Sequence, residues 1–160
     1  MNGCVQWPAL DEAGLTALAV RFAEPLRGGG VIHLCGELGA GKTTFSRALI
    51  RALGVGERVK SPTYSLIESY RVDELQVHHL DLYRIAQADE LEWLGLADLV
   101  DDAALLLVEW PERGAGALPP ADLRIQLAHA GDRRDIRICA LTPRGRNTLD
   151  AVTASGADNS

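Results

Sequence analysis

The chain has 160 residues, of which 47% are hydrophobic and 24% are charged, and its formal net charge is −6. This length fits one globular domain with little room for a second, and the composition excludes a chain that is disordered throughout. No apolar run approaches the roughly 18 residues of a membrane span, and no basic stretch leads into an apolar one at the N-terminus. The three cysteines are widely spaced, which is typical of neither a disulfide framework nor a metal site. We therefore expect a cytoplasmic protein without membrane contact.

The first third of the chain predicts a helix, a strand and a second helix. Apolar side chains recur at helical spacing over residues 12–23, and Asp11 is available as the N-terminal cap. Three consecutive glycines at 28–30 end this segment, and the short apolar run at 31–35 is typical of a strand. Residues 42–53 predict the second helix, which is expected to end at Gly54 and Gly56.

A glycine-rich loop, Gly-Glu-Leu-Gly-Ala-Gly-Lys-Thr at residues 36–43, joins this strand to the second helix. It matches the phosphate-binding pattern G-x-x-x-x-G-K-[ST], the Walker A motif or P-loop, in the required context. Glycines let successive backbone N–H groups point at phosphate oxygens, and the helix presents its positive N-terminus to the same anion. The residues predicted to bind the nucleotide are Glu37, Leu38, Gly39, Ala40, Gly41, Lys42, Thr43 and Thr44.

The rest of the chain predicts mainly strands. Residues 65–71 and 75–81 are typical of two strands joined by a polar turn, and the acidic, amphipathic segment 88–99 predicts a helix. The continuous apolar run at 103–108 is typical of a strand buried on both faces. Residues 123–129 and 135–141 alternate around Gly131 and Asp132, which predicts an antiparallel hairpin.

This order of elements predicts an α/β fold. We expect a three-layer P-loop NTPase domain over residues 1–141, with a mostly parallel central sheet that antiparallel strands extend. Residues 142–160 are expected to form a C-terminal tail that carries one short helix near residues 149–152 or is disordered.

Two carboxylates are candidates for a magnesium site, because a P-loop protein needs an acidic side chain at the end of a neighbouring strand. Glu109 directly follows the buried apolar strand, and Asp81 ends the strand 75–81. His79 lies two residues before Asp81 and so on the same face of that strand. Both carboxylates fall in residues 61–112, where 12 acidic and 2 basic side chains argue against a broad nucleic-acid surface.

The segment Ser-Pro-Thr-Tyr at residues 61–64 follows the second helix. Its threonine, Thr63, could sense the magnesium and the γ-phosphate as switch loops do. An ordinary proline turn leading into the next strand is the alternative interpretation.

Several nucleotide-binding classes are excluded. The only lysines, Lys42 and Lys60, do not follow an asparagine, so the guanine-reading Asn-Lys-x-Asp of Ras-type GTPases is absent. ABC-type and AAA-type ATPases need larger domains. A partner-directed ATPase, a small-metabolite kinase and a nucleotide-binding module without hydrolysis remain. A kinase lid would carry arginines, whereas the dense basic cluster Arg133, Arg134 and Arg137 falls in the predicted hairpin.

Four elements in this order resemble one family: the P-loop, Ser-Pro-Thr-Tyr at 61–64, His-x-Asp-x-Tyr-Arg at 79–84 and Glu-Trp-Pro at 109–111. From its first helix to residue 141 the chain is similar to the bacterial tRNA threonylcarbamoyladenosine biosynthesis ATPases of the TsaE family. Many families share the P-loop alone, whereas the other three elements are far more specific. The tail carries no matching motif.

The resemblance implies an ATPase that works with two partner proteins, TsaB and TsaD. Their complex attaches a threonylcarbamoyl group to adenosine 37 of tRNA, and hydrolysis of ATP by the third component resets that complex, so contact with tRNA is indirect. No arginine finger is identifiable in the sequence, which predicts weak ATPase activity without the partners.

The resemblance also implies roles for the candidate residues. Lys42 and the loop amides would hold the phosphates of ATP, and Thr43 and Glu109 would hold Mg²⁺, with Thr63 and Asp81 as further candidate ligands. The residues expected to act in catalysis are Lys42, Asp81 and Glu109, and either Asp81 or Glu109 would orient the attacking water. For Trp110, packing near the nucleotide or a partner and a structural role under the loop both stay open. For Arg84, the alternatives are a contact with a partner and pairing with nearby carboxylates.

Overall fold

The computed structural model describes residues 3–55, 66–93, 95–96 and 101–157. Seven strands form one sheet in the order β1-β7-β6-β2-β5-β4-β3. In chain order the strands are β1 (Cys4–Leu10), β2 (Gly30–Cys35), β3 (Ile67–Val72), β4 (Leu75–Asp81), β5 (Leu105–Glu109), β6 (Leu123–Ala130) and β7 (Arg133–Ala140). The helices are α1 (Glu12–Arg21), α2 (Lys42–Ile50), α3 (Glu90–Trp93) and α5 (Pro143–Ala157).

The centre of the sheet is parallel and its margins are antiparallel, as predicted. Strand β2 pairs in parallel with β5 and β6, and β4 pairs in parallel with β5. Strand β3 is antiparallel to β4, and β7 is antiparallel to both β6 and β1. Every residue of β5 is buried, which confirms the predicted interior strand. Its bounds differ from the predicted 103–108: Ala103 lies exposed in the preceding turn, and Glu109 is the last residue of the strand rather than the residue after it.

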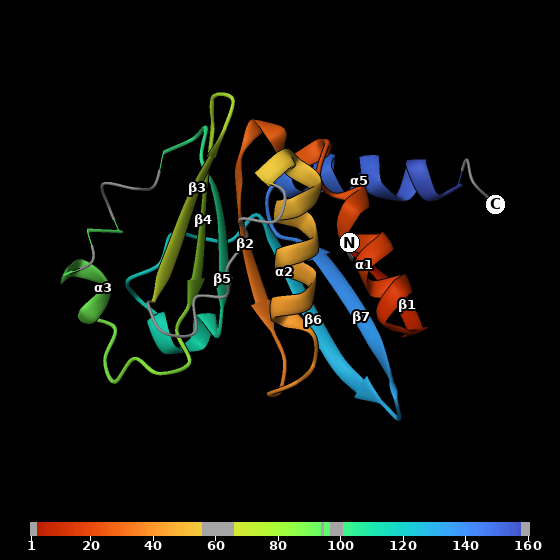
Figure 1. Cartoon of the computed structure of the whole chain (residues 1–160), viewed down its shortest axis with the longest axis horizontal. Helices are drawn as coiled ribbons and strands as arrows, with labels where there is room; N and C mark the ends of the chain where they lie inside the picture. Colours follow the sequence, from red (N-terminus) through yellow and green to blue (C-terminus); the bar gives the residue numbers. More distant parts are fainter. Residues whose placement is uncertain (1–2, 56–65, 94, 97–100, 158–160) are drawn as a thin grey trace.

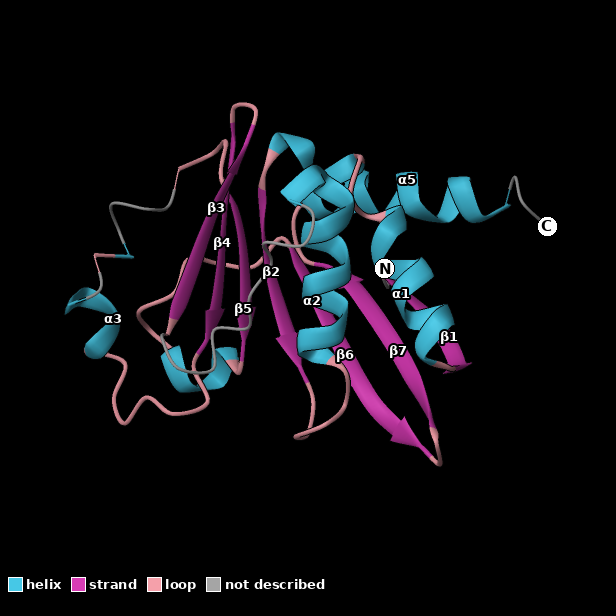
Figure 2. Ribbon diagram, in the orientation of Figure 1, coloured by secondary structure: helices cyan, strands magenta, loops and turns pink. Residues whose placement is uncertain are grey.

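Two apolar cores lie on opposite faces of the sheet and make three layers. Alternate residues of β5 point to opposite faces, so Leu105 and Leu107 join the larger core while Leu106 and Val108 join the smaller one. The larger core packs α1, α2 and α5 against one face, and Figure 2 shows these helices grouped over that part of the sheet. The smaller core packs the segment around α3 against the other face.

The N-terminal helix forms for the predicted reason. The Asp11 carboxylate accepts a hydrogen bond of 2.8 Å from the Gly14 N–H, which satisfies one of the free donors of the first turn of α1. The helix ends at Arg21, slightly before the expected end. Strand β1, which precedes it, was not predicted; it lies at the edge of the sheet, where its Pro8 breaks no central ladder.

Three other predictions on secondary structure need correction. Helix α2 ends at Ile50 and passes into one π-helical turn, Arg51–Val55, in which Gly54 has φ 118°. In the segment predicted to be helical at 88–99, α3 spans only Glu90–Trp93, and residues 94 and 97–99 lie outside the described part. The short helix expected near 149–152 is α5, 15 residues long, because Leu149 and Val152 bury their side chains in the larger core.

The cysteines also differ from expectation. Cys4 and Cys139 are register partners in the β1–β7 ladder and form a disulfide, although 135 residues separate them in sequence. The spacing of the cysteines could not show this pairing, since only the strand order brings the two residues together. Cys35 is a free thiol. None of the helices in the described ranges is long and apolar enough to cross a membrane.

Candidate active site

The predicted P-loop connects the end of β2 to the start of α2, so the strand, the loop and the helix have the expected arrangement. All three of its glycines have positive φ angles: Gly36 at 153°, Gly39 at 78° and Gly41 at 107°. A Cβ atom on Gly41 would lie 2.8 Å from the Leu15 Cδ2 atom of α1. Glycine at this position therefore permits both the turn of the loop and the close packing of α1 against it.

A cleft of about 540 Å³ opens in front of this loop. It brings the P-loop together with side chains from the ends of β4 and β5. The predicted residues that line it are Leu38, Gly39, Ala40, Gly41, Lys42, Thr43, Thr44, Asp81 and Glu109. Tyr83, Arg84 and Trp110 also line the cleft. Glu37 lies beside it and contributes a backbone carbonyl to the contacts of Lys42, and Thr63 lies outside the described residues.

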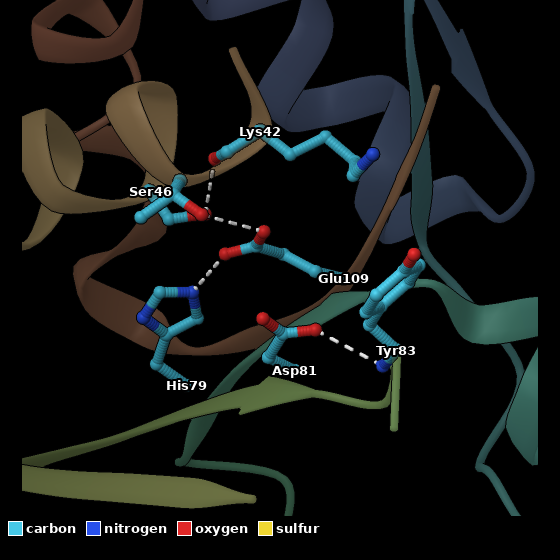
Figure 3. A network of polar contacts seen from close by, with 7 residues as sticks. Lys42, Ser46, His79, Asp81, Tyr83 and Glu109 are labelled. Atoms are coloured by element: carbon cyan, nitrogen blue, oxygen red, sulfur yellow. Dashed lines mark hydrogen bonds and ion pairs between the residues drawn. The ribbon is translucent and has the colours of Figure 1, made fainter. Parts of the chain in front are cut away.

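Glu109 lies at the centre of the polar network (Figure 3). Its Oε1 atom accepts a hydrogen bond of 2.8 Å from the Thr43 hydroxyl, and its Oε2 atom lies 2.6 Å from the His79 Nε2 atom. Glu109 is 2% exposed and His79 is fully buried. Sequence spacing placed His79 near the site, and the structure shows that its partner is Glu109. The buried carboxylate is therefore held from two sides.

Asp81 has a different environment, although it is the register partner of Glu109 across β4 and β5. Its Oδ1 atom accepts a hydrogen bond of 3.0 Å from the Tyr83 N–H. Burial raises the pKa of Asp81; the Tyr83 N–H opposes this rise, and the nearby charge of Glu109 adds to it. Asp81 thus faces the cleft as a partly desolvated carboxylate that is less firmly held than Glu109.

Lys42 is 5% exposed, and its ammonium group donates to the backbone carbonyls of Gly36 and Glu37. The same Nζ atom lies 3.9 Å from the centroid of the Trp110 ring, at a distance typical of a cation–π contact. Burial lowers the pKa of Lys42, while the neighbouring carboxylates, first among them Glu109, oppose this shift. A desolvated ammonium at the start of a helix can bind phosphate strongly, since little water competes for it.

Trp110 is positioned by an unusual backbone conformation. Its φ and ψ angles are 58° and 51°, a left-handed conformation that is rare and strained for a bulky residue. Its ring packs against Tyr83 with a centroid separation of 4.9 Å, and the Arg113 guanidinium lies 5.3 Å from the Tyr83 ring. Trp110 therefore forms a wall of the cleft. The sequence offered no sign that Arg113 would lie near this wall.

The donor set fits a nucleotide and Mg²⁺. Helix α2, 9 residues long, begins at Lys42, so its free N–H groups face the cleft end of the loop. In the described part of the chain no group of three or more His, Cys, Asp or Glu side chains could hold a metal by itself. Mg²⁺ is usually held by one or two carboxylates together with substrate phosphates. Thr43, Glu109 and Asp81 match that pattern, since the remaining ligands would come from phosphate oxygens and water.

Proteins of one family are similar to this chain over most of its length. Residues 10–136 match the family model described as "Threonylcarbamoyl adenosine biosynthesis protein TsaE". A relative from Haemophilus influenzae, named tRNA threonylcarbamoyladenosine biosynthesis protein TsaE, is 38% identical over 148 residues, which cover 89% of this chain and 94% of the relative. A protein of the same name from Bacillus subtilis is 37% identical over 135 residues, which cover 84% of this chain and 82% of that protein. The crystal structure of Bacillus subtilis YdiB superposes with a TM-score of 0.81 at 28% identity and covers 98% of each chain.

Proposed function

The chain belongs to the TsaE family, and we propose that it is the ATPase component of the machinery that makes threonylcarbamoyladenosine at position 37 of tRNA. It binds Mg-ATP in the cleft and hydrolyses it. Hydrolysis resets a complex of TsaB-like and TsaD-like partners between turnovers. The observation that carries the proposal is the hydrogen bond from the P-loop hydroxyl of Thr43 to the buried carboxylate of Glu109, within one cleft.

In this proposal the P-loop supplies the phosphate site. Amides of the loop other than the Ala40 N–H, which donates to the Glu37 carbonyl, and those of the first turn of α2 donate to phosphate oxygens. Lys42 neutralises charge on the β- and γ-phosphates. Thr43 and Glu109 hold Mg²⁺, directly or through water. Magnesium neutralises the charge on the phosphate oxygens when it is bound. Thr44, which also lines the cleft, is suited to bond the α-phosphate.

We assign different roles to the two carboxylates. Both oxygens of Glu109 already have partners, Thr43 and His79, so its orientation is set and it suits the metal shell. Asp81 has one oxygen bonded to a backbone N–H, and its raised pKa makes it a better proton acceptor than an ordinary aspartate. Asp81 therefore orients the attacking water and Glu109 orients the metal.

The protein hydrolyses ATP slowly without its partners. Arg84, which lines the cleft, is an exposed side chain. An exposed arginine stabilises transition-state charge poorly until something orders it. A partner that covers the cleft would both exclude water and order such a side chain. The alternative of a small-metabolite kinase has less support, because the cluster Arg133, Arg134 and Arg137 lies in β7 rather than in a lid.

The test is ATP turnover with and without purified TsaB-like and TsaD-like partners, with the products analysed. Release of one phosphate to water for each ATP, accelerated by the partners, is the expected result. Transfer of the phosphoryl group to a small metabolite would contradict the proposal. Co-purification of the chain with the partner pair in the presence of ATP, but not in its absence, tests the assembly separately.

A further inference from the structure

The β6–β7 hairpin touches the P-loop at several successive points. At the base of the loop, a Cβ atom on Gly36 would lie 2.5 Å from the backbone oxygen of Leu127 in β6. Further along, the His129 Nε2 atom lies 3.3 Å from the Leu38 carbonyl oxygen, and the Arg134 Nη2 atom donates to the Gly39 carbonyl at 3.1 Å. Figure 1 shows the hairpin tip and the β2–α2 loop at the same end of the sheet.

The two hairpin side chains act on adjacent peptide groups of the loop. His129 and Arg134 are register partners across β6 and β7, so their side chains reach the loop from one place. Leu38 and Gly39 line the cleft, whereas His129 and Arg134 do not. The hairpin therefore holds the loop carbonyls on the side away from the cleft.

The geometry of the peptide group turns these contacts into an orientation of the loop. In a planar trans peptide the C=O and the following N–H point in opposite directions. A Leu38 carbonyl held by the hairpin directs the Gly39 N–H away from the hairpin. The next peptide is fixed at both ends, because the Gly39 carbonyl binds Arg134 and the Ala40 N–H donates to the Glu37 carbonyl at 3.0 Å. Glycine at 39, with φ 78°, would otherwise leave this segment free to turn.

We propose that the β6–β7 hairpin is a clamp on the P-loop, in which Arg134 and His129 are positioning residues that hold the loop backbone in the conformation that receives phosphate. The inference rests on the proposed binding of a nucleotide at this loop. It assigns a role to part of the basic cluster that the proposed function leaves unused. Preorganisation of this kind increases affinity because the loop loses less conformational freedom when the anion binds.

The hairpin offers a matched control. Arg133 is adjacent to Arg134 and carries the same charge, but its guanidinium donates to the Ala9 carbonyl of β1 rather than to the loop. Replacing either arginine by alanine changes the net charge equally. A difference between Arg133→Ala and Arg134→Ala therefore reports the contact with the loop, not the charge of the surface.

The experiment is isothermal titration of the full chain with Mg-ADP and, separately, with magnesium pyrophosphate, a probe that has no nucleoside. We expect Arg134→Ala to weaken the binding of both probes by a similar factor, about three- to tenfold. His129→Ala is expected to weaken both by about twofold, and Arg133→Ala by less than that. Arg134→Lys, which keeps a long donor, is expected to restore part of the affinity, whereas Arg134→Met is not. The melting temperature without ligand serves as the check on folding.

Three results with the variants would overturn the clamp. Weaker binding of ADP with unchanged binding of pyrophosphate would mean that Arg134 contacts the nucleoside. An equal loss in Arg133→Ala would mean that only charge matters. Unchanged binding of both probes by Arg134→Ala would remove the positioning role and leave the proposed function intact. If the unmodified chain bound neither probe, the proposed function itself would be wrong, and the clamp with it.

Discussion

The P-loop lies between two neighbours of opposite character. On one side are the ends of β4 and β5, which contribute the buried network of His79 and Glu109 and the partly buried Asp81. On the other side is the β6–β7 hairpin, whose arginines are exposed or only half-buried. Removing one partner of a buried pair leaves the other partner with no hydrogen bond, from protein or from water, so the loss of free energy is large. When an exposed partner is removed, water takes its place and the loss is small. The carboxylate side should therefore govern chemistry, and the hairpin side should tune affinity.

The largest effect on ATP turnover is expected from a substitution in the P-loop itself, which both neighbours contact. Lys42→Ala should reduce ATP turnover to background and abolish ATP-dependent tRNA modification, since the phosphates lose their main cation. The chain should still fold, because the removed ammonium is a desolvated charge and not an apolar core residue. Turnover assays together with circular dichroism check both statements. Normal modification by this variant would contradict the proposed role of the loop.

A large effect is expected on the carboxylate side. Asp81→Asn should lower partner-stimulated turnover by about a hundredfold, because the amide cannot accept the proton of the attacking water. Nucleotide should still bind to this variant. Glu109→Gln should instead shift the magnesium dependence. Single-turnover rates and the Mg²⁺ concentration for half-maximal rate separate the two variants. If both variants shifted the Mg²⁺ dependence equally, the assignment of the water to Asp81 and of the metal to Glu109 would be wrong.

The pH dependence tests the same assignment. Because burial raises the pKa of Asp81, turnover should begin to fall, on acidification, at a pH above the ordinary range of aspartate. The unfolded chain ionises Asp81 at the ordinary value, so the free energy of unfolding falls as pH rises from that value through the raised one. Asp81→Asn should therefore be slightly more stable than the parent at pH 7. Urea unfolding with EDTA present measures this difference.

An intermediate effect is expected at His79, which supports the carboxylate without lining the cleft. His79→Phe keeps a ring but leaves the Glu109 Oε2 atom without its partner. The Mg²⁺ concentration for half-maximal turnover should rise about tenfold. The control is His78→Phe: His78 is also buried, but it bonds the Ser69 hydroxyl at 2.8 Å on the opposite face of β4. Equal Mg²⁺ shifts in the two variants would reduce the role of His79 to packing.

The smallest effect on the site is expected from the cap of α1, the helix that packs on the hairpin side of the loop. Asp11→Ala removes the bond to the Gly14 N–H and should lower the free energy of unfolding by about 1 kcal/mol. The dissociation constant for Mg-ADP should change by less than about twofold, because the Leu15 contact with Gly41 is kept. A larger change in the dissociation constant would mean that the stability of α1 and the affinity of the cleft for nucleotide are coupled.

Contacts between neighbours in the chain could be predicted. The P-loop motif lies entirely within eight consecutive residues. The strand before it, the loop and the helix after it could therefore be predicted from the sequence. The buried strand β5 and the β6–β7 hairpin are likewise visible in local apolar patterns. Strand β1 was missed because a short edge strand containing proline has no such pattern.

The pairings between residues far apart in the chain could not be predicted, because they depend on strand order and register. The bond between His79 and Glu109 joins residues 30 apart, and it forms because β4 and β5 are parallel neighbours. The Cys4–Cys139 disulfide and the contact of Arg134 with Gly39 join residues 135 and 95 apart. A sequence specifies the chemistry of each side chain, and the spacing of its apolar residues indicates whether a segment forms a helix or a strand. Which distant side chains meet is decided only when burial of both faces of β5 selects one arrangement of strands.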